Sequence, residues 1–143
     1  MRSLSVLIVE DEALVAAELE LIVEEAGHHS VGSAIDSEEA VEMGAQTHPD
    51  LAFVDVHLGD GPTGVETARR LADLGVQVIF MTANPKRLPP DCAGALGVVP
   101  KPYAPGGVRQ ALDYASSILD GGAPVSPPAM RAWSPGWSLA LNG

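Results

Sequence analysis

Short apolar runs alternate with amphipathic stretches along most of the chain. The apolar runs are too short for buried helices and are typical of buried strands in a parallel sheet. Strong strands are predicted at 4–9, 51–56 and 76–82, and weaker ones at 30–34 and 97–99. Helices are predicted between and after them, at 13–26, 36–46, 65–74 and 108–119. This alternation predicts an α/β domain in which helices cover both faces of a parallel sheet.

Details of the helical stretches refine this picture. In the first, Leu14, Ala17 and Leu21 recur at helical spacing, with Val15 and Ile22 as further members and glutamates between them, which predicts one apolar stripe. Asp36 and Thr63 stand where the second and third helices begin, and both residue types cap helices. A fourth helix is expected after residue 82, but three prolines between residues 85 and 90 predict that it is short or irregular.

The composition changes near residue 122. Residues 1–122 are predicted to form one domain, and residues 123–143 a tail rich in proline, serine and glycine. Trp133 and Trp137 stand out in this tail, because exposed tryptophans usually find a surface. They are expected to pack on the same chain, to contact a second copy in a dimer, or to stay disordered.

Charge and cysteine content exclude some functions. The formal net charge is −11, which argues against direct DNA binding because phosphate backbones repel an acidic surface. Cys92 is the single cysteine, so a disulfide within the chain is impossible and a reducing, cytoplasmic compartment is expected. No segment is long and apolar enough to suggest a membrane span. The four histidines are expected in loops or at the surface.

Polar side chains stand where the predicted strands end. Glu10 and Asp11 follow the first strand, and Asp55 lies near the end of the third. Thr82 ends the fourth strand, and Lys101 follows the fifth. The carboxyl ends of parallel strands meet at one edge, so these residues are expected to converge there. Clustered carboxylates need a cation, and Mg²⁺ suits oxygen ligands beside a phosphoryl group. The set therefore predicts a phosphoryl-binding pocket with a carboxylate nucleophile.

The same residues resemble the receiver domain of bacterial response regulators over about residues 4–120. The matching motifs are Val9-Glu10-Asp11-Glu12, Asp55 at its strand end, Thr82-Ala83 and Lys101-Pro102. The resemblance implies a flavodoxin-like, doubly wound sheet of five parallel strands in the order 2-1-3-4-5. It also implies a stand-alone phosphoacceptor switch of a two-component system, not an enzyme beyond self-dephosphorylation.

The resemblance assigns roles to individual residues. Asp55 takes a phosphoryl group from the phosphohistidine of a sensor histidine kinase, and a histidine phosphotransfer protein is a further partner. Mg²⁺ is bound by the carboxylates of Glu10, Asp11 and Asp55 and by the backbone carbonyl of His57. Thr82 and Lys101 contact the phosphoryl oxygens, and the bond before Pro102 is cis. From their positions two residues after Asp55 and Thr82, His57 and Asn84 are expected to modulate phosphate loss, with a solvent-exposed loop residue as the alternative for His57.

Three features depart from the family pattern, and one of them is Pro100, directly before Lys101. Val98 occupies the position three before the lysine where the family usually has an aromatic switch residue. The proline-rich stretch falls on the usual output face. Output is therefore expected through protein binding or a phosphorelay by another route, with a homodimer through the last helix (108–119) or the tail as a further expectation.

Two other functions use similar residues. A haloacid-dehalogenase-type phosphatase also uses a strand-end aspartate, but it needs a second aspartate two residues on, where this chain has His57. A receiver-like interaction module without phosphorylation is the second alternative. Residues 59–64 match the glycine pattern of dinucleotide-binding loops, yet the next strand ends without an acidic residue for a ribose, which disfavours that reading.

Overall fold

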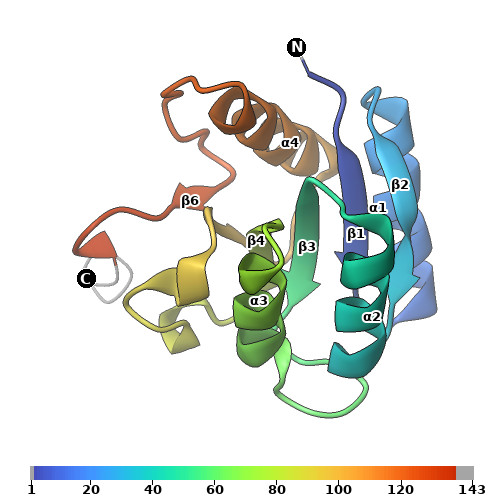
Figure 1. Ribbon diagram of the computed structural model, residues 1–143. Coiled ribbons are helices and arrows are strands. Elements are labelled where there is room, and N and C mark those ends of the chain that lie inside the picture. Colours follow the sequence, from blue (N-terminus) through green and yellow to red (C-terminus); the bar gives the residue numbers. More distant parts are fainter. Residues whose placement is uncertain (1, 138–143) are drawn as a thin grey trace.

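The computed structural model describes residues 2–137, arranged as one mostly parallel sheet between helices (Figure 1). The strands are β1 (Ser5–Val9), β2 (His29–Ala34), β3 (Leu51–Asp55), β4 (Gln77–Thr82), β5 (Gly97–Pro100) and β6 (Arg131–Ala132). The helices are α1 (Ala13–Glu25), α2 (Ser37–Thr47), α3 (Gly64–Asp73), α4 (Pro105–Leu119) and the short 3-10 helices η1 (Pro85–Arg87) and η2 (Cys92–Gly94). None of these helices is long and apolar enough to cross a membrane.

The strand order is β2-β1-β3-β4-β5-β6. The first five strands pair in parallel, which confirms the predicted order 2-1-3-4-5. β6 adds an antiparallel edge strand against β5 that the sequence did not predict. It comes from the segment predicted to be an extended tail, of which residues 138–143 lie outside the described part.

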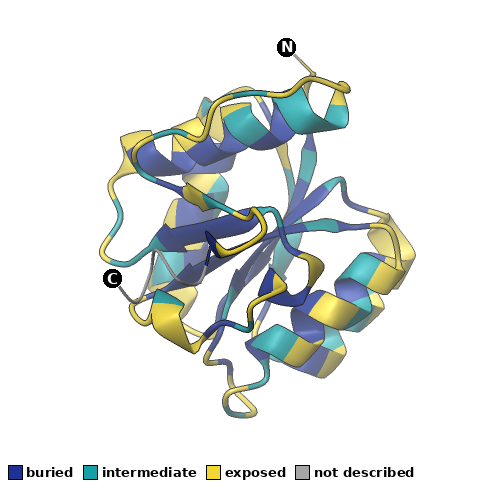
Figure 2. Ribbon diagram, turned by 90° about the vertical axis from the view of Figure 1, so that its left-hand side faces the viewer, coloured by how far each residue is buried: buried dark blue, intermediate teal, exposed yellow. Residues whose placement is uncertain are grey.

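Both faces of the sheet are buried. Alternate side chains of β1 point to opposite faces, so Leu7 packs with α2 and α3, whereas Ile8 packs with α1 and α4. Phe80 and Phe53 are the largest fully buried side chains of the two sides. The central strands are mostly dark blue and the outer helix surfaces largely yellow (Figure 2). This two-sided core explains why the central strands are almost wholly apolar.

The segment between β4 and β5 contains no α-helix. η1 and η2 take its place, each three residues long, and Pro89 and Pro90 lie between them. Proline lacks the backbone N–H that a helix interior needs, so the chain cannot continue a regular helix here. The prediction of a short or irregular fourth helix is thus confirmed.

The predicted apolar stripe of α1 is wrong for Leu14 and Leu21, and of its residues only Ile22 is buried. Leu14 and Leu21 are 87% and 59% exposed. The buried side chains of the helix are Ala16, Leu19, Ile22 and Val23. The helix has apolar residues on two faces, and its position between β1, β2 and α4 selects the second one. An apolar stripe therefore faces solvent beside the carboxyl edge of the sheet.

Two polar residues also differ from expectation. His28 is buried, with 4% of its surface exposed, and its Nδ1 accepts a hydrogen bond from the backbone N–H of Leu4. Thr63 precedes α3, but its hydroxyl donates to Asp60 and does not cap the helix. The predicted cap of α2 is confirmed, because Asp36 accepts a hydrogen bond from the backbone N–H of Glu39.

Candidate functional site

The strand-end polar residues converge at the carboxyl edge of the sheet. Glu10 follows β1, Asp55 ends β3 and Thr82 ends β4. The register places Asp55 beside Met81 and Thr82 beside Pro100, so Lys101 comes one residue beyond. The parallel arrangement brings these groups together although they lie far apart in the sequence. The predicted edge site therefore exists as a geometric cluster.

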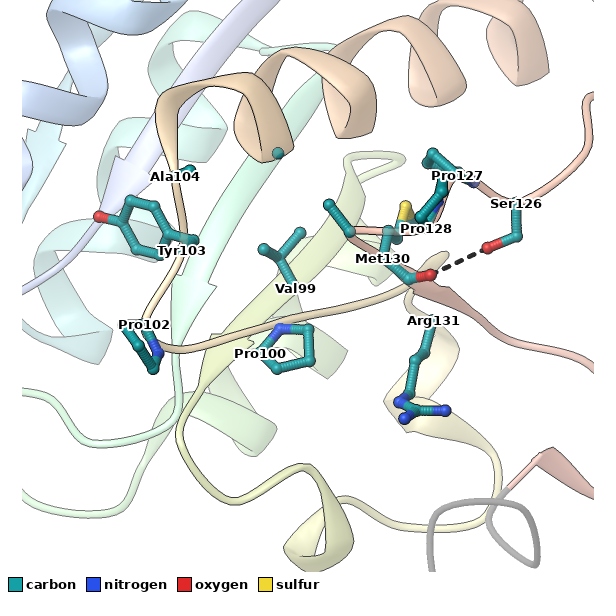
Figure 3. Close-up of a pocket in the computed structure, with 12 residues that line it drawn as sticks. Val99, Pro100, Pro102, Tyr103, Ala104, Ser126, Pro127, Pro128, Met130 and Arg131 are labelled. Atoms are coloured by element: carbon teal, nitrogen blue, oxygen red, sulfur yellow. Dashed lines mark hydrogen bonds between the residues drawn. The ribbon is translucent and has the colours of Figure 1, made fainter.

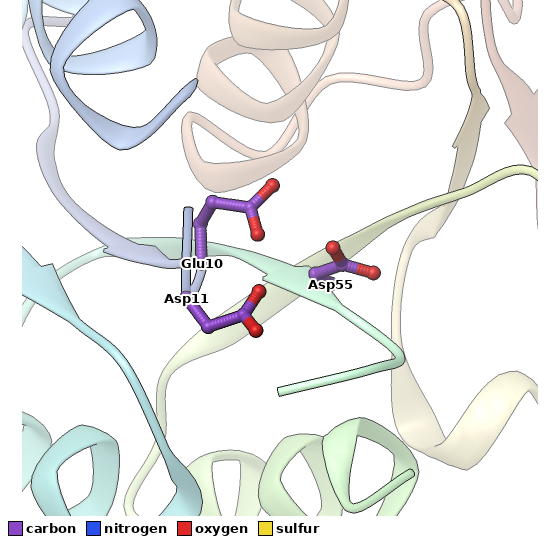
Figure 4. Close-up of side chains that lie close together, drawn as sticks. All are labelled: Glu10, Asp11 and Asp55. Carbon is purple, nitrogen blue, oxygen red and sulfur yellow. The ribbon is translucent and has the colours of Figure 1, made fainter. Parts of the chain in front are cut away.

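Three carboxylates form the centre of this cluster. Glu10, Asp11 and Asp55 each offer an oxygen, and these atoms all lie within 4.8 Å of one another (Figure 4). Glu10 is buried, Asp55 is half-buried and Asp11 is exposed. Like charges at this spacing repel one another, and the donor set consists of oxygens alone. Such a set fits a hard divalent cation of the Mg²⁺ type, with Asp11 on the side open to solvent.

Lys101 provides the positive charge of the site. Its Nζ donates to Asp55 Oδ2 at 2.9 Å and to Glu10 Oε1 at 3.1 Å. Burial alone lowers the pKa of Lys101, but the hydrogen bonds to both carboxylates outweigh it, so the pKa is raised and the ammonium stays charged. Burial raises the pKa of Glu10 to about 7, against the lowering effect of Lys101 and together with the charge of Asp55. One lysine thus only partly compensates the three acids.

The remaining predicted residues surround this centre. Thr82 is buried, and its Oγ1 accepts a hydrogen bond from the backbone N–H of Asn84 at 3.1 Å. The His57 backbone N–H donates to Asp55 Oδ1 at 3.2 Å, while the His57 side chain is exposed. Asn84 is exposed on the loop that follows β4. The Lys101–Pro102 peptide bond is cis.

Gly64 is a site residue that the sequence did not reveal. A β-carbon at Gly64 would overlap with the carbonyl oxygen of Asp55 and lie 2.5 Å from the Cα of Val56. The Gly64 N–H also donates to the Val56 carbonyl at 2.9 Å. The first turn of α3 therefore presses against the backbone that carries Asp55. A glycine after a loop threonine gives no sequence signal for such a contact.

A groove beside Lys101 leads away from the cluster. It measures about 390 Å³ and lies between α1 and the loop after β5, lined by Glu12, Val15, Glu18, Ala83 and Tyr103, among others. Burial raises the pKa of Tyr103 to about 12, so its hydroxyl stays protonated at neutral pH. The exposed Leu14 belongs to the same helix as one wall of this groove. The site therefore opens toward a surface with apolar and acidic groups.

Known proteins are similar to this chain in sequence and fold. The family model of the response regulator receiver domain matches residues 6–113. The phyllosphere-induced regulator PhyR of Methylorubrum extorquens is 35% identical over 113 residues, which are 77% of this chain and 42% of that protein. The solution structure of the PhyR receiver domain from Erythrobacter litoralis is 34% identical with a TM-score of 0.73, and it covers 87% of this chain and 97% of that one.

A longer protein is similar over much the same share of this chain. The crystal structure of the anti-anti-sigma factor PhyR from Bartonella quintana is 34% identical with a TM-score of 0.71, covering 85% of this chain and 50% of that one. The chain thus spans about half the length of these full-length relatives. The match runs from β1 into α4 and includes every strand-end residue of the cluster. The chain belongs to the response regulator receiver domain family.

Proposed function

We propose that this chain is a phosphorylation-driven switch that accepts a phosphoryl group on Asp55 from a sensor histidine kinase. The observation that carries the proposal is the position of the Asp55 carboxylate, 2.9 Å from Lys101 Nζ and grouped with Glu10 and Asp11 at the open edge of the sheet. A half-buried carboxylate beside a fixed ammonium is a nucleophile with a charge partner for the incoming group.

The proposed transfer is a simple displacement at phosphorus. A carboxylate oxygen of Asp55 attacks the phosphorus, the P–N bond of the kinase's phosphohistidine breaks, and its electron pair returns to the imidazole nitrogen. The product is an acyl phosphate on Asp55. Lys101 already donates to this carboxylate, so its ammonium is placed to balance charge on the phosphoryl oxygens. The buried hydroxyl of Thr82, on the neighbouring strand, is the proposed second donor.

Glu10, Asp11, Asp55 and the backbone carbonyl of His57 are the proposed Mg²⁺ ligands. The divalent cation supplies positive charge that offsets the carboxylates and the phosphoryl oxygens. The excess of acid over base in the described cluster supports this assignment. His57 and Asn84 are exposed on the two loops that border Asp55, and we propose that they modulate the access of water and thus the loss of phosphate.

Output is proposed to occur through binding to another protein or through transfer to a histidine phosphotransfer protein. The net charge of −11 disfavours direct contact with DNA. The Bartonella quintana relative is named an anti-anti-sigma factor, which is a protein-binding role. We place the switch in the cytoplasm, since its single cysteine is free. A homodimer through α4 stays a prediction that light scattering checks.

The proposal is tested with a small phosphodonor. With Mg²⁺ and acetyl phosphate, the intact mass of the native chain is expected to rise by one phosphate, and Asp55→Asn is expected to abolish the rise. Asp73→Asn, at the end of α3, is the matched control and should behave as the native chain. An unmodified native chain under saturating donor would contradict the proposal.

The same preparation separates the phosphatase alternative. Hydrolysis of a phosphate ester with turnover would favour a haloacid-dehalogenase-type enzyme. We expect none, because His57 stands two residues after Asp55 where that class needs an acid. The only turnover proposed for this site is attack of water on the acyl phosphate, which releases inorganic phosphate and restores the Asp55 carboxylate.

A further inference from the structure

Residues 123–137, called the strap below, fold back onto the sheet. Within the strap, β6 pairs with β5 through Ala132 opposite Gly97, and the Trp133 N–H donates to the Leu96 carbonyl at 2.7 Å. A β-carbon at Gly97 would overlap with the Arg131 carbonyl oxygen, so the close approach of the two strands depends on this glycine. Figure 1 shows β6 at the outer edge of the sheet. The strap therefore occupies the edge of β5.

The strap is anchored by buried side chains. Met130 is 3% exposed and packs with the core on the α1 and α4 side of the sheet. Trp137 is 6% exposed and packs with the core on the other side. Burial of large apolar side chains on both sides of one strand is typical of a specific contact, unlike that of a flexible linker.

Both tryptophans hold the connection between β4 and β5. Trp133 Nε1 and Trp137 Nε1 donate to the same acceptor, the Pro90 carbonyl oxygen, at 3.0 and 2.8 Å. Pro90 lies between η1 and η2, in the segment that replaces the fourth helix. The strap therefore contacts two elements, β5 and this connection. Thr82 lies at the start of the connection, and Lys101 directly follows β5.

A cavity lies between the strap and the segment that runs from the end of β5 past Lys101. It measures about 470 Å³ and separates strap residues 126–131 from Val99, Pro100, Pro102 and Tyr103 (Figure 3). Pro100 and Pro102 flank Lys101, and each fixes its own backbone φ angle. The backbone around Lys101 is therefore stiff, and free volume lies beside it.

From this arrangement we infer that docking of the strap is coupled to phosphorylation of Asp55, and that the phosphorylated chain holds the strap less tightly. The inference rests on the proposed phosphoacceptor function. Lys101 Nζ now bonds to the Asp55 and Glu10 carboxylates, and a phosphoryl group on Asp55 moves the negative charge outward from the carboxylate. Lys101 then moves outward with that charge. The proline-flanked segment pulls β5 with it, and β5 pairs with β6 along its edge.

Release of the strap gives the chain an output surface of its own. It uncovers the edge of β5 at Gly97 and Val98 and the sockets of Met130 and Trp137. An open strand edge beside apolar sockets accepts an extended segment of a partner protein. The route needs neither an aromatic residue at position 98 nor a regular fourth helix.

Hydrogen exchange of the full chain tests the coupling. In Mg²⁺ and acetyl phosphate, with the phosphorylated fraction read from the intact mass, the backbone amides of residues 131–133 are expected to exchange about tenfold faster than in the unmodified chain. Amides of α2 serve as the internal control. A full mass shift with unchanged or slower strap exchange overturns the inference alone. Absence of the mass shift overturns the proposed function, and the inference falls with it.

A variant tests the reverse direction, since coupling between two sites is reciprocal. The double variant Trp133→Phe and Trp137→Phe replaces each indole by a smaller aromatic ring and removes both N–H donors to Pro90. It is expected to speed strap exchange and to bind beryllofluoride, a phosphoryl mimic, about three- to tenfold more tightly in Mg²⁺. Thr47→Ala, which removes one side-chain hydrogen bond to a carbonyl on α2, is the control. If the double variant exchanges its strap amides faster but binds beryllofluoride with unchanged affinity, the coupling is contradicted. Strap exchange that is the same in the double variant and the native chain contradicts it as well.

Discussion

At the scale of single residues, Gly64 shows how a missing side chain positions a functional one. Its Cα lies so close to the backbone of Asp55 and Val56 that any β-carbon forces the start of α3 away from β3. Gly64→Ala is therefore expected to lower the free energy of unfolding by about 1–3 kcal/mol, the usual cost of overpacking a filled site. It should also slow phosphorylation of Asp55, because the same shift displaces that carboxylate.

Urea unfolding and the rate of mass increase with acetyl phosphate measure the two effects of Gly64→Ala. Gly106→Ala is the matched control, since a β-carbon there meets no atom within 4 Å and the site lies in the first turn of α4. It should be neutral or slightly stabilising, because alanine favours helix more than glycine does. Equal stability of the two variants would contradict the role given to Gly64.

His28 links the fold to pH. Burial lowers the pKa of His28 from its usual 6.5, against a weaker opposing effect of Asp113. Below about pH 6.5 the unfolded chain therefore binds more protons at this histidine than the folded chain does. Its contribution to stability is complete above that pH and is lost as the pH falls below it.

Replacing His28 by glutamine is expected to flatten the loss of stability between about pH 6.5 and pH 5, where the unfolded-state imidazole titrates. Glu10 acts in the opposite sense, since its raised pKa favours the folded state at low pH, so the variant is compared with the native chain at each pH. Urea unfolding over a pH series measures the difference. His48→Asn, on an exposed histidine with a positive φ angle that asparagine tolerates, should leave the curve unchanged. Parallel curves for His28→Gln and the native chain would rule the linkage out.

At the scale of elements, α1 exposes an apolar surface beside the candidate site. Leu14 and Leu21 are exposed on it, and Glu18 lies on the groove beside Lys101. An exposed apolar stripe next to a reactive site, with acidic neighbours, is typical of a protein contact. Leu14→Asp is therefore expected to slow phosphotransfer from the cognate kinase by about tenfold or more, as central apolar contacts contribute ~1–2 kcal/mol.

Phosphorylation of Leu14→Asp is measured with two phosphoryl donors, the kinase and acetyl phosphate. Transfer from the kinase should be slow, whereas labelling by acetyl phosphate should stay at the native rate, because the small donor needs no docking surface. Leu74→Asp is the control, an exposed leucine that follows α3. A loss of both reactions in Leu14→Asp would indicate damage to the site and not to docking.

The elements also show what sequence patterns do and do not determine. β1, β3 and β4 were predictable because a strand buried on both faces is a continuous apolar run, and the polar residue that ends it marks the site edge. The buried face of α1 was not predictable from spacing, since two apolar faces compete and only tertiary packing chooses. β6 was not predictable from the local sequence pattern, because Met130 and Trp137, which anchor this segment, pack against residues distant in the sequence.

At the scale of the whole molecule, charge sets the balance between stability and function. The chain carries a net charge of −11, and its edge site groups three carboxylates with one lysine. Without a divalent cation this repulsion opposes folding. A variant with fewer charges at the site should then fold more stably, at the expense of binding the cation.

Asp11→Asn tests this balance directly, because Asp11 is the exposed member of the cluster and its loss leaves the core intact. Without Mg²⁺, the variant is expected to melt at the same or a higher temperature than the native chain. With Mg²⁺ at about 100 times its dissociation constant, the native chain should gain about 2.7 kcal/mol, while the variant gains much less. Calorimetry with and without Mg²⁺ measures both effects. KCl at matched ionic strength separates general screening, which should stabilise the native chain far less than Mg²⁺ does. If Asp11→Asn gains as much stability from Mg²⁺ as the native chain does, Asp11 is not one of the Mg²⁺ ligands. If Asp11→Asn melts at a lower temperature than the native chain without Mg²⁺, Asp11 stabilises the fold instead of opposing it.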